Sequence, residues 1–183
     1  MAVAPILEEL RGAHREDVPA GTQPMRGRGA AAAPGGKTAR TLAIYPAAAG
    51  FDLVEELDYL CARSVEPNIF FNPRFLAPAM PRLEDKEIRL AVIRDDDATR
   101  SRLRLLVPFS VEKPRVPFAV PIMRTWSNPF GPLGTPLVDN DDPETVIGDF
   151  FSLLGRRHLK LPQVFVLPEM RLDGPFAAIL TTF

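Results

Sequence analysis

Hydrophobic and polar positions after residue 40 follow two periods, and each period predicts a different kind of element. The apolar run TLAIY, residues 41–45, predicts a first strand that stops at Pro46. Residues 51–64, FDLVEELDYLCARS, repeat their large side chains at near-helical spacing, which predicts an amphipathic helix. Its expected apolar side comprises Phe51, Val54, Leu57, Tyr59, Leu60 and Cys61. A second, shorter helix is predicted to begin at Pro73, with Asn72 as its N-cap.

Two alternating apolar runs, residues 88–96 (IRLAVIRDD) and 102–113 (RLRLLVPFSVEK), are separated by a short polar connector, which predicts an antiparallel hairpin. Three consecutive aspartates, beginning at Asp95, lead into its short connector. Because successive side chains of a strand point to opposite faces, a solvated turn is favoured there over a Ca²⁺ or Mg²⁺ loop. A third strand is predicted over residues 116–124, whose two prolines favour a sheet edge or a bulge.

The rest of the pattern predicts a helix, a strand and another helix. DDPETVIGDFFSLLGRRH has Asp142 as its predicted N-cap, a proline in the first helical position and one apolar face. A last strand is predicted over residues 163–170, and a final helix begins near Asp173 or Gly174. Its apolar run reaches Phe183 without a polar stop, so we expect the chain to be part of a longer ancestral protein. The predicted fold class is mixed α/β, with a mainly antiparallel sheet flanked by helices.

Composition divides the chain into a tail and one domain. Residues 18–40 contain basic residues but no acidic or aromatic residue, and few large aliphatic ones. Such a segment cannot offset its ordering entropy through burial, so residues 1–40 are predicted to be a disordered, low-complexity basic tail. The whole chain has 183 residues and is 46% hydrophobic, which suits a single core, and residues 41–183 are predicted to form it.

Charge and reactive residue types limit the function further. The formal net charge of -1 gives no global basic field, so nucleic acid is not an expected partner. One cysteine excludes an intramolecular disulfide, and with only two histidines no metal site is expected. No apolar run is long enough for a transmembrane helix, and the N-terminus lacks a signal-peptide pattern. We therefore expect a cytoplasmic protein with no transmembrane segment.

Several short motifs resemble functional sites, but ordinary structure explains each of them better. PGGKT has Ala31 where a phosphate-binding P-loop requires glycine, and RGRG at residues 26–29 lacks interleaved aromatic residues. Cys61 is interpreted as an inert core thiol, and His158 as a charge at a helix C-terminus. No glycine-rich loop between a strand and a helix offers free amides to a pyrophosphate, so no cofactor site is expected in this chain.

Four motifs follow one another in an order that resembles a known family. They are EPNIFFNPRFL (66–76), RTWSNP (124–129), LGTPLVD (133–139) and LPEMRLDGP (167–175). The order is similar to that in the N-terminal half of CelD-like N-acetyltransferases of the GNAT superfamily, a group associated with cellulose biosynthesis. The similarity extends over about residues 41–180.

This resemblance implies a GNAT-like N-terminal domain, truncated before a second GNAT-like domain. The tandem arrangement is similar to that of Fem-type aminoacyl transferases, and the second domain of the complete enzyme would bind acetyl-CoA or another acyl-CoA. No cofactor is therefore expected in this chain, and no catalytic residue can be transferred to it, because no position matches a catalytic motif. The implied partners are a small-molecule or saccharide acceptor and either a second GNAT-like domain or another copy of the chain.

Residues 124–144 allow two interpretations. As the wall of an acceptor site, Trp126 offers a flat apolar face and Asn128 and Thr135 offer neutral hydrogen-bonding groups, with Phe130 as a further substrate-binding candidate. As ordinary structure, Asn128 and the proline after it start a turn, two glycines permit positive φ, and Trp126 covers an edge of the core.

Two functions remain open. In the first, the chain is the acceptor-side domain of a GNAT-type acyltransferase that moves an acyl group from acyl-CoA to an amine or a hydroxyl, in exopolysaccharide or cellulose biosynthesis. In the second, it is a non-catalytic binding or interaction module that uses an apolar face left open by the missing domain.

Overall fold

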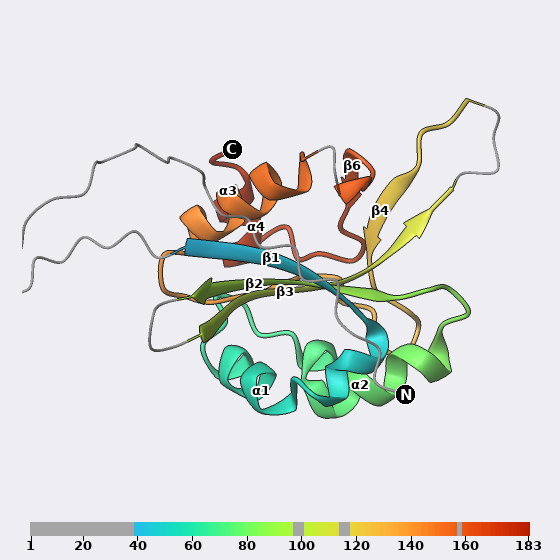
Figure 1. Ribbon diagram of the computed structural model, residues 1–183, viewed down its shortest axis with the longest axis horizontal. Coiled ribbons are helices and arrows are strands. Elements are labelled where there is room, and N and C mark those ends of the chain that lie inside the picture. Colours follow the sequence, from blue (N-terminus) through green and yellow to red (C-terminus); the bar gives the residue numbers. More distant parts are fainter. Residues whose placement is uncertain (1–38, 97–100, 114–117, 157–158) are drawn as a thin grey trace, which may run out of the picture.

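A single mixed sheet lies between two layers of helices in the computed structural model, which describes residues 39–96, 101–113, 118–156 and 159–183 (Figure 1). In chain order the elements are β1 (Ala39–Pro46), η1 (Ala47–Phe51), α1 (Val54–Ala62), η2 (Ile69–Phe71), α2 (Pro73–Leu83), β2 (Arg89–Asp96), β3 (Ser101–Glu112), β4 (Ile122–Thr125), β5 (Leu137–Val138), α3 (Pro143–Leu154), β6 (Val164–Val166) and α4 (Pro175–Leu180). Almost all of the predicted tail, with RGRG and PGGKT, lies outside the described residues, as do His158 and the middle of the β2–β3 connector.

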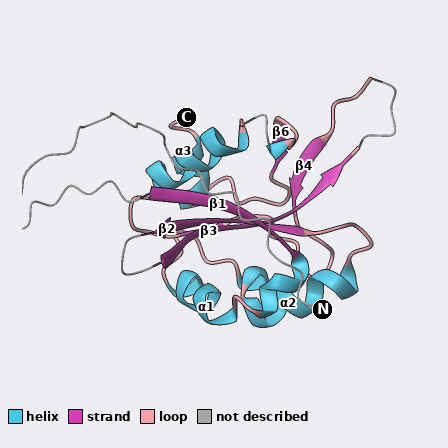
Figure 2. Ribbon diagram, in the orientation of Figure 1, coloured by secondary structure: helices cyan, strands magenta, loops and turns pink. Residues whose placement is uncertain are grey.

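The strand order is β1-β2-β3-β4-β6, and the short β5 pairs with β3 beside this path. Every pairing is antiparallel except that of β4 with β6, which are parallel and separated in the chain by β5 and α3. Figure 2 shows the long β2 and β3 at the centre of the sheet, with helices on both sides. The predicted class, a mixed α/β fold with a mainly antiparallel sheet flanked by helices, is confirmed.

The third strand differs from its prediction. Residues 116 and 117 of the predicted range lie outside the described residues, and 118–121 are not in a strand. The strand forms over Ile122–Thr125 and lies between β3 and β6, not at an edge. Pro121 lies immediately before this strand. A proline has no backbone N–H to donate, so it is disfavoured inside a strand that is hydrogen-bonded to neighbours on both sides. The last strand is also shorter than predicted, three residues from Val164 to Val166.

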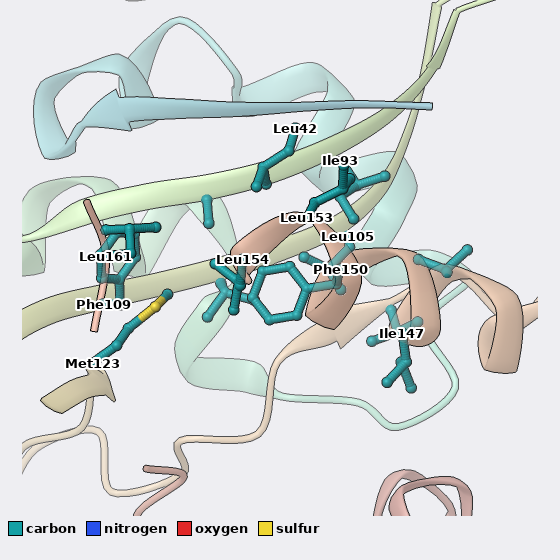
Figure 3. Close-up of a cluster of buried hydrophobic side chains, with 14 of the residues drawn as sticks. Leu42, Ile93, Leu105, Phe109, Met123, Ile147, Phe150, Leu153, Leu154 and Leu161 are labelled. Atoms are coloured by element: carbon teal, nitrogen blue, oxygen red, sulfur yellow. The ribbon is translucent and has the colours of Figure 1, made fainter. Parts of the chain in front are cut away.

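Two hydrophobic clusters fill the space between the sheet and its helices, one on each face. Alternation along β2 produces both, since Leu90 and Val92 face α1 and α2 while Ala91 and Ile93 face α3 and α4. Figure 3 shows the second of these clusters, in which side chains of α3 such as Phe150 pack against the strands. The middle of β2 and most of β3 are therefore buried on both faces of the sheet.

The apolar side predicted for α1 is partly wrong. Leu57 and Leu60 are fully buried, but Tyr59 is 72% exposed and Phe51, which lies before the helix, is 55% exposed. At about 100° per residue, Tyr59 lies far around the helix from both leucines, so it cannot share their face. Its exposure places an aromatic ring on the surface of the α1 layer.

The two predicted N-caps have different outcomes. Asn72 caps α2 as predicted, since its side chain accepts a hydrogen bond from Arg74 N and Pro73 is the first helical residue. Asp142 does precede α3, but it adopts a left-handed conformation with φ 57° and makes no side-chain cap bond. Its carboxylate accepts a hydrogen bond from the Thr145 hydroxyl (2.7 Å) instead.

Candidate functional site

Trp126, the first predicted site residue, lies inside the domain. It follows β4, and its backbone N–H donates to the carbonyl of Pro108 on β3 (2.8 Å), which fixes its direction. Its ring is 2% exposed and packs against Phe71 and Phe75, with ring centroids 6.3 and 6.4 Å away. The side chain therefore completes the core on the α2 side of the sheet, and its indole Nε1 has no hydrogen-bond partner among the described residues.

Asn128 and Phe130 form a tight turn, as the second interpretation of this segment predicts. The backbones of Asn128 and Gly131 exchange two hydrogen bonds, of 3.1 and 3.0 Å. Asn128 Oδ1 also accepts from the N–H groups of Phe130 (2.8 Å) and Gly131 (3.0 Å). The turn places Phe130 at its tip with 71% of the residue exposed, so Phe130 is the predicted site residue with the most accessible aromatic ring.

Thr135 is buried in the loop that leads to β5. Asn68, from the connection between α1 and α2, donates through Nδ2 to the carbonyl oxygens of Leu133 (3.1 Å) and Thr135 (2.8 Å). Both Asn68 and Thr135 are almost fully buried, and the Thr135 hydroxyl has no partner among the described residues. Side-chain hydrogen bonds thus replace secondary structure in holding this loop.

Close approach, and not positive φ, explains Gly134. A Cβ at this position would collide with the carbonyl oxygen of Pro168 and would lie 2.9 Å from Thr125 Oγ1, whereas the backbone is outside the positive-φ region. The glycine therefore lets the loop before β5 touch the loop after β6. The prediction of positive φ is wrong for this glycine and for Gly131, whose backbone is outside that region too.

Glu66 joins the first motif to the fourth. It is 3% exposed, and its Oε2 accepts a hydrogen bond from the backbone N–H of Phe176 (3.3 Å), in the first turn of α4. The same carboxylate lies against Gly174, which precedes that helix. A carboxylate at the start of a helix is favoured by the free N–H groups there.

Three motifs that are distant in the sequence therefore meet in one buried place. We call this place the motif junction and define it by Glu66, Asn68, Gly134, Thr135, Pro168 and Gly174. Of the predicted site residues, Thr135 belongs to the junction and Trp126 lies directly after Thr125, which touches it. Asn128 and Phe130 lie on the turn beside it, where Gly131 packs against Phe70.

A separate cleft, which the sequence did not suggest, lies beside α1. It has a volume of about 420 Å³ and is lined by Glu56, Tyr59, Arg63, Ser101, Arg102 and Leu103. We call it the arginine cleft. Its position depends on backbone pairing between residues 63–65 and 138–140, in which Val65 N donates to Val138 O and Asn140 N to Arg63 O (2.8 Å each).

Buried Asp139 organises the charges next to this cleft. It has no exposed surface. Its carboxylate accepts hydrogen bonds from Arg102 Nε (3.2 Å) and Nη2 (2.9 Å) and forms an ion pair with Arg63 Nη2 (2.9 Å). A register shift opposite Ile93 and Arg94 makes Arg104 the extra residue of a bulge in β3. This lets Arg104 turn toward Asp141 (3.0 Å), which Arg102 also contacts (3.1 Å).

The ion pairs extend from this cluster to the start of β1. Arg104 Nε lies 3.3 Å from Asp95 Oδ2 but is not aligned for a hydrogen bond, so the two side chains form an ion pair without one. Arg40 donates to Asp95 (2.9 Å) and to Asp149 of α3 (2.7 Å). Burial lowers the pKa of Arg40, but hydrogen bonds to Asp149 and Asp95 outweigh it and raise the pKa overall. The guanidinium thus remains charged.

Two features of the sequence indicate this cluster. Arg102 and Arg104 are charged residues inside an otherwise apolar strand, and Asp139 ends the motif LGTPLVD. A charge at a position predicted to be buried requires a partner of opposite charge. The partner itself could not be identified, because β5 is only two residues long and the pattern did not predict it.

Cys61 belongs neither to the motif junction nor to the lining of the arginine cleft. Burial, and to a lesser degree the charge of Asp58, raises the pKa of the Cys61 thiol to about 11, which disfavours the nucleophilic thiolate.

Within the ranges that the structure describes, no group of three or more His, Cys, Asp or Glu side chains could hold a metal ion. None of the helices in those ranges is both long and apolar enough to span a bilayer.

No family model, no curated protein and no solved structure matches the chain. The structure itself defines a mixed α/β domain in which the four motifs are neighbours and the arginine cleft lies apart from most of them.

Proposed function

We propose that this chain is the acceptor-side domain of a GNAT-type acyltransferase of the CelD-like group that its motifs resemble. In this proposal a second domain binds acyl-CoA, and the present domain positions an amine or hydroxyl acceptor, such as a saccharide in exopolysaccharide or cellulose biosynthesis. The observation that supports it most directly is the motif junction. Segments 66–68, 133–135 and 168–174 belong to three of the motifs, and they contact one another.

The exposed rim of the motif junction is the place proposed for the acceptor. The Asn128–Gly131 turn holds Phe130 outward, and an exposed ring is suited to the apolar face of a sugar. Trp126 acts behind the turn by packing against Phe71 and Phe75 instead of touching the acceptor. Attack on the acyl group requires a base to remove the proton of the acceptor, and we assign no residue to that role.

An NMR titration of the ¹⁵N-labelled chain tests the proposal. Glucosamine and cellobiose serve as amine and hydroxyl probes, and acetyl-CoA is titrated separately. We expect a saccharide to shift the backbone signals of residues 128–135 and acetyl-CoA to shift none. Phe130→Ala should abolish the saccharide shifts, whereas Phe51→Ala, which removes an exposed ring elsewhere, should preserve them. Saccharides without effect, or acetyl-CoA bound with a micromolar dissociation constant, would refute the proposal.

The second candidate function, an interaction module, is favoured by one observation. Ile69, Phe130 and Leu172 have 71%, 71% and 84% of their surface exposed, and each is within four residues of a junction residue. Exposed apolar side chains around one buried site are typical of a protein interface. Sedimentation equilibrium distinguishes the two functions. The interaction module would be favoured if the parent chain self-associates, the Phe130→Ala variant is monomeric, and saccharides cause no NMR shifts in the parent chain.

A further inference from the structure

The arginine cleft combines an apolar side with a charged one. Leu103 is buried at the cleft, and the ring of Tyr59 is largely exposed beside it. Arg63, the residue directly after α1, and Arg102 of β3 line the same cleft. A volume of about 420 Å³ is within the usual range for pockets that hold small molecules.

Both arginines are fixed in place before any ligand binds. Arg102 donates to Asp139 through Nε and Nη2 and to Asp141 through Nη1 (3.1 Å). Arg63 contacts Asp139 through Nη2, and its Nε donates to the carbonyl of Tyr59 (3.3 Å). Their side chains nevertheless remain 36% and 38% exposed, and each guanidinium has five N–H donors. Ordered guanidiniums with N–H groups left for a ligand lose little entropy on binding, which favours recognition of a carboxylate.

Charge around the cleft favours a ligand with a single negative charge. Glu56, the acidic residue of the lining, is paired with Arg94 of β2. Within the lining, Arg63 and Arg102 exceed this one carboxylate by a single positive charge. Behind the lining, the ion-pair network contains four arginines and five carboxylates, and two of these, Asp142 and Asp149, contact Arg40 on the α3 side.

We propose that the arginine cleft binds a small molecule that carries one carboxylate on a six-membered ring with an apolar face. The carboxylate accepts hydrogen bonds from Arg63 and Arg102, and the ring lies against Tyr59 and Leu103. An aromatic acid and a uronic acid share this chemistry. The proposal does not depend on the acyltransferase function, because the cleft contains none of the predicted acceptor-site residues.

NMR titration of the full chain tests this site with four probes. Benzoate and glucuronate carry the carboxylate, and benzamide and methyl glucoside are their neutral counterparts. We expect one acid or both to shift the Arg63 and Arg102 Nε–H signals and the Tyr59 ring signals in a saturable way. A response to benzoate alone identifies an aromatic acid, and a response to glucuronate alone identifies an acidic saccharide. If neither acid shifts these signals, or if the neutral probes shift them equally, the proposal is wrong.

Matched variants test the two sides of the cleft separately. Tyr59→Ala should weaken binding about tenfold, the equivalent of 1.4 kcal/mol, whereas Tyr59→Phe should keep the affinity of the parent. Since the Tyr59 residue is mostly exposed, neither change should impair folding. Arg63→Gln should weaken binding by at least as much, while Arg74→Gln removes the same charge from an exposed position on α2 and should have little effect. An unchanged affinity in Tyr59→Ala, or equal losses in the two arginine variants, would overturn the proposal.

Discussion

The carboxylate of Glu66 lies so close to Gly174 that it would have to move to admit a side chain at that glycine. The backbone of Gly174 is extended, with φ -83° and ψ 160°, which any residue can adopt. Steric contact with Glu66 is therefore the reason for a glycine here, and backbone conformation is not. The contact joins the segment after α1 to the start of α4 and helps to form the motif junction.

Gly174→Ala should consequently destabilise the domain by about 1–3 kcal/mol, the usual cost of adding a methyl group to a packed site. The free energy of unfolding in urea, followed by circular dichroism, measures this cost. Gly155→Ala is the matched control, because a Cβ at Gly155 would make only ordinary contacts at 3.6 Å and its φ of -65° is helical. That variant should be neutral or slightly more stable.

A double variant determines whether Glu66 is the cause. If the collision with Glu66 destabilises Gly174→Ala, the loss in Glu66→Ala/Gly174→Ala should be smaller than the sum of the two single losses. Additive losses would show that the added methyl group is accommodated in another way.

The sequence predicts the parts of this fold that depend on local chemistry. Asn72 caps α2 because the residues that complete the cap are its immediate neighbours, and the alternation of residues 88–96 is enough to predict β2. The burial of Trp126 depends on Phe71 and Phe75, which are more than fifty positions earlier in the chain. A single-sequence pattern carries no information on such a pairing.

The same distinction applies to the candidate sites. A turn at Asn128 could be predicted, because its hydrogen bonds connect residues two and three positions apart. The arginine cleft could not, since it requires Asp139 to contact Arg63, directly after α1, and Arg102 of β3 at once. The bulge at Arg104, which changes the face to which the following residues of β3 point, was likewise not visible in the alternation.

Trp126 provides a spectroscopic test of its own position. Because it is the one tryptophan of the chain and its ring is buried, native fluorescence should be blue-shifted relative to that of the urea-unfolded chain and protected from iodide quenching. Saccharides that bind near Phe130 should not quench it by direct contact. Strong iodide quenching in the native state would place the ring at the surface and restore it as a candidate for acceptor stacking.

Trp126→Phe should cost about 1 kcal/mol of unfolding free energy, less than the 3–5 kcal/mol expected for Trp126→Ala. The smaller ring keeps part of the contact with Phe71 and Phe75. It also removes an indole N–H that has no partner within the described part of the chain, and relief of that desolvation cost offsets some of the lost packing. Urea unfolding of both variants measures the difference.

Cys61 should react slowly with iodoacetamide in the native protein. A pKa of about 11, against 9.0 for an unperturbed thiol, lowers the thiolate fraction at pH 7 by about 100-fold. The alkylation rate of the native chain should therefore be lower than that of the urea-unfolded chain by at least this factor, since burial also restricts access. Equal rates in the two states would show that the thiol is exposed and unperturbed.

Acidification should weaken the ion-pair network that holds Asp141 and Asp142. Hydrogen bonds from Arg104 and Arg102 lower the pKa of Asp141, and hydrogen bonds from the Thr145 hydroxyl and Arg40 lower that of Asp142. A carboxylate whose folded pKa is below its unfolded value of about 3.9 stabilises the fold above that pH. This stabilisation is lost as the pH falls through the folded pKa, so the unfolding free energy should decline below about pH 4.

Asp141→Asn tests this contribution, because it removes the titrating group and keeps the shape of the side chain. The variant should show a shallower decline in unfolding free energy below pH 4 than the parent protein. At pH 7 it should be only slightly less stable, since Asp141 is largely exposed to solvent. Asp85→Asn removes one carboxylate at an exposed position between α2 and β2, which separates the loss of a charge from the loss of these hydrogen bonds. If Asp141→Asn followed the parent curve throughout the acid range, Arg102 and Arg104 would not hold Asp141 in solution, and the charged edge of the arginine cleft would be looser than the structure shows.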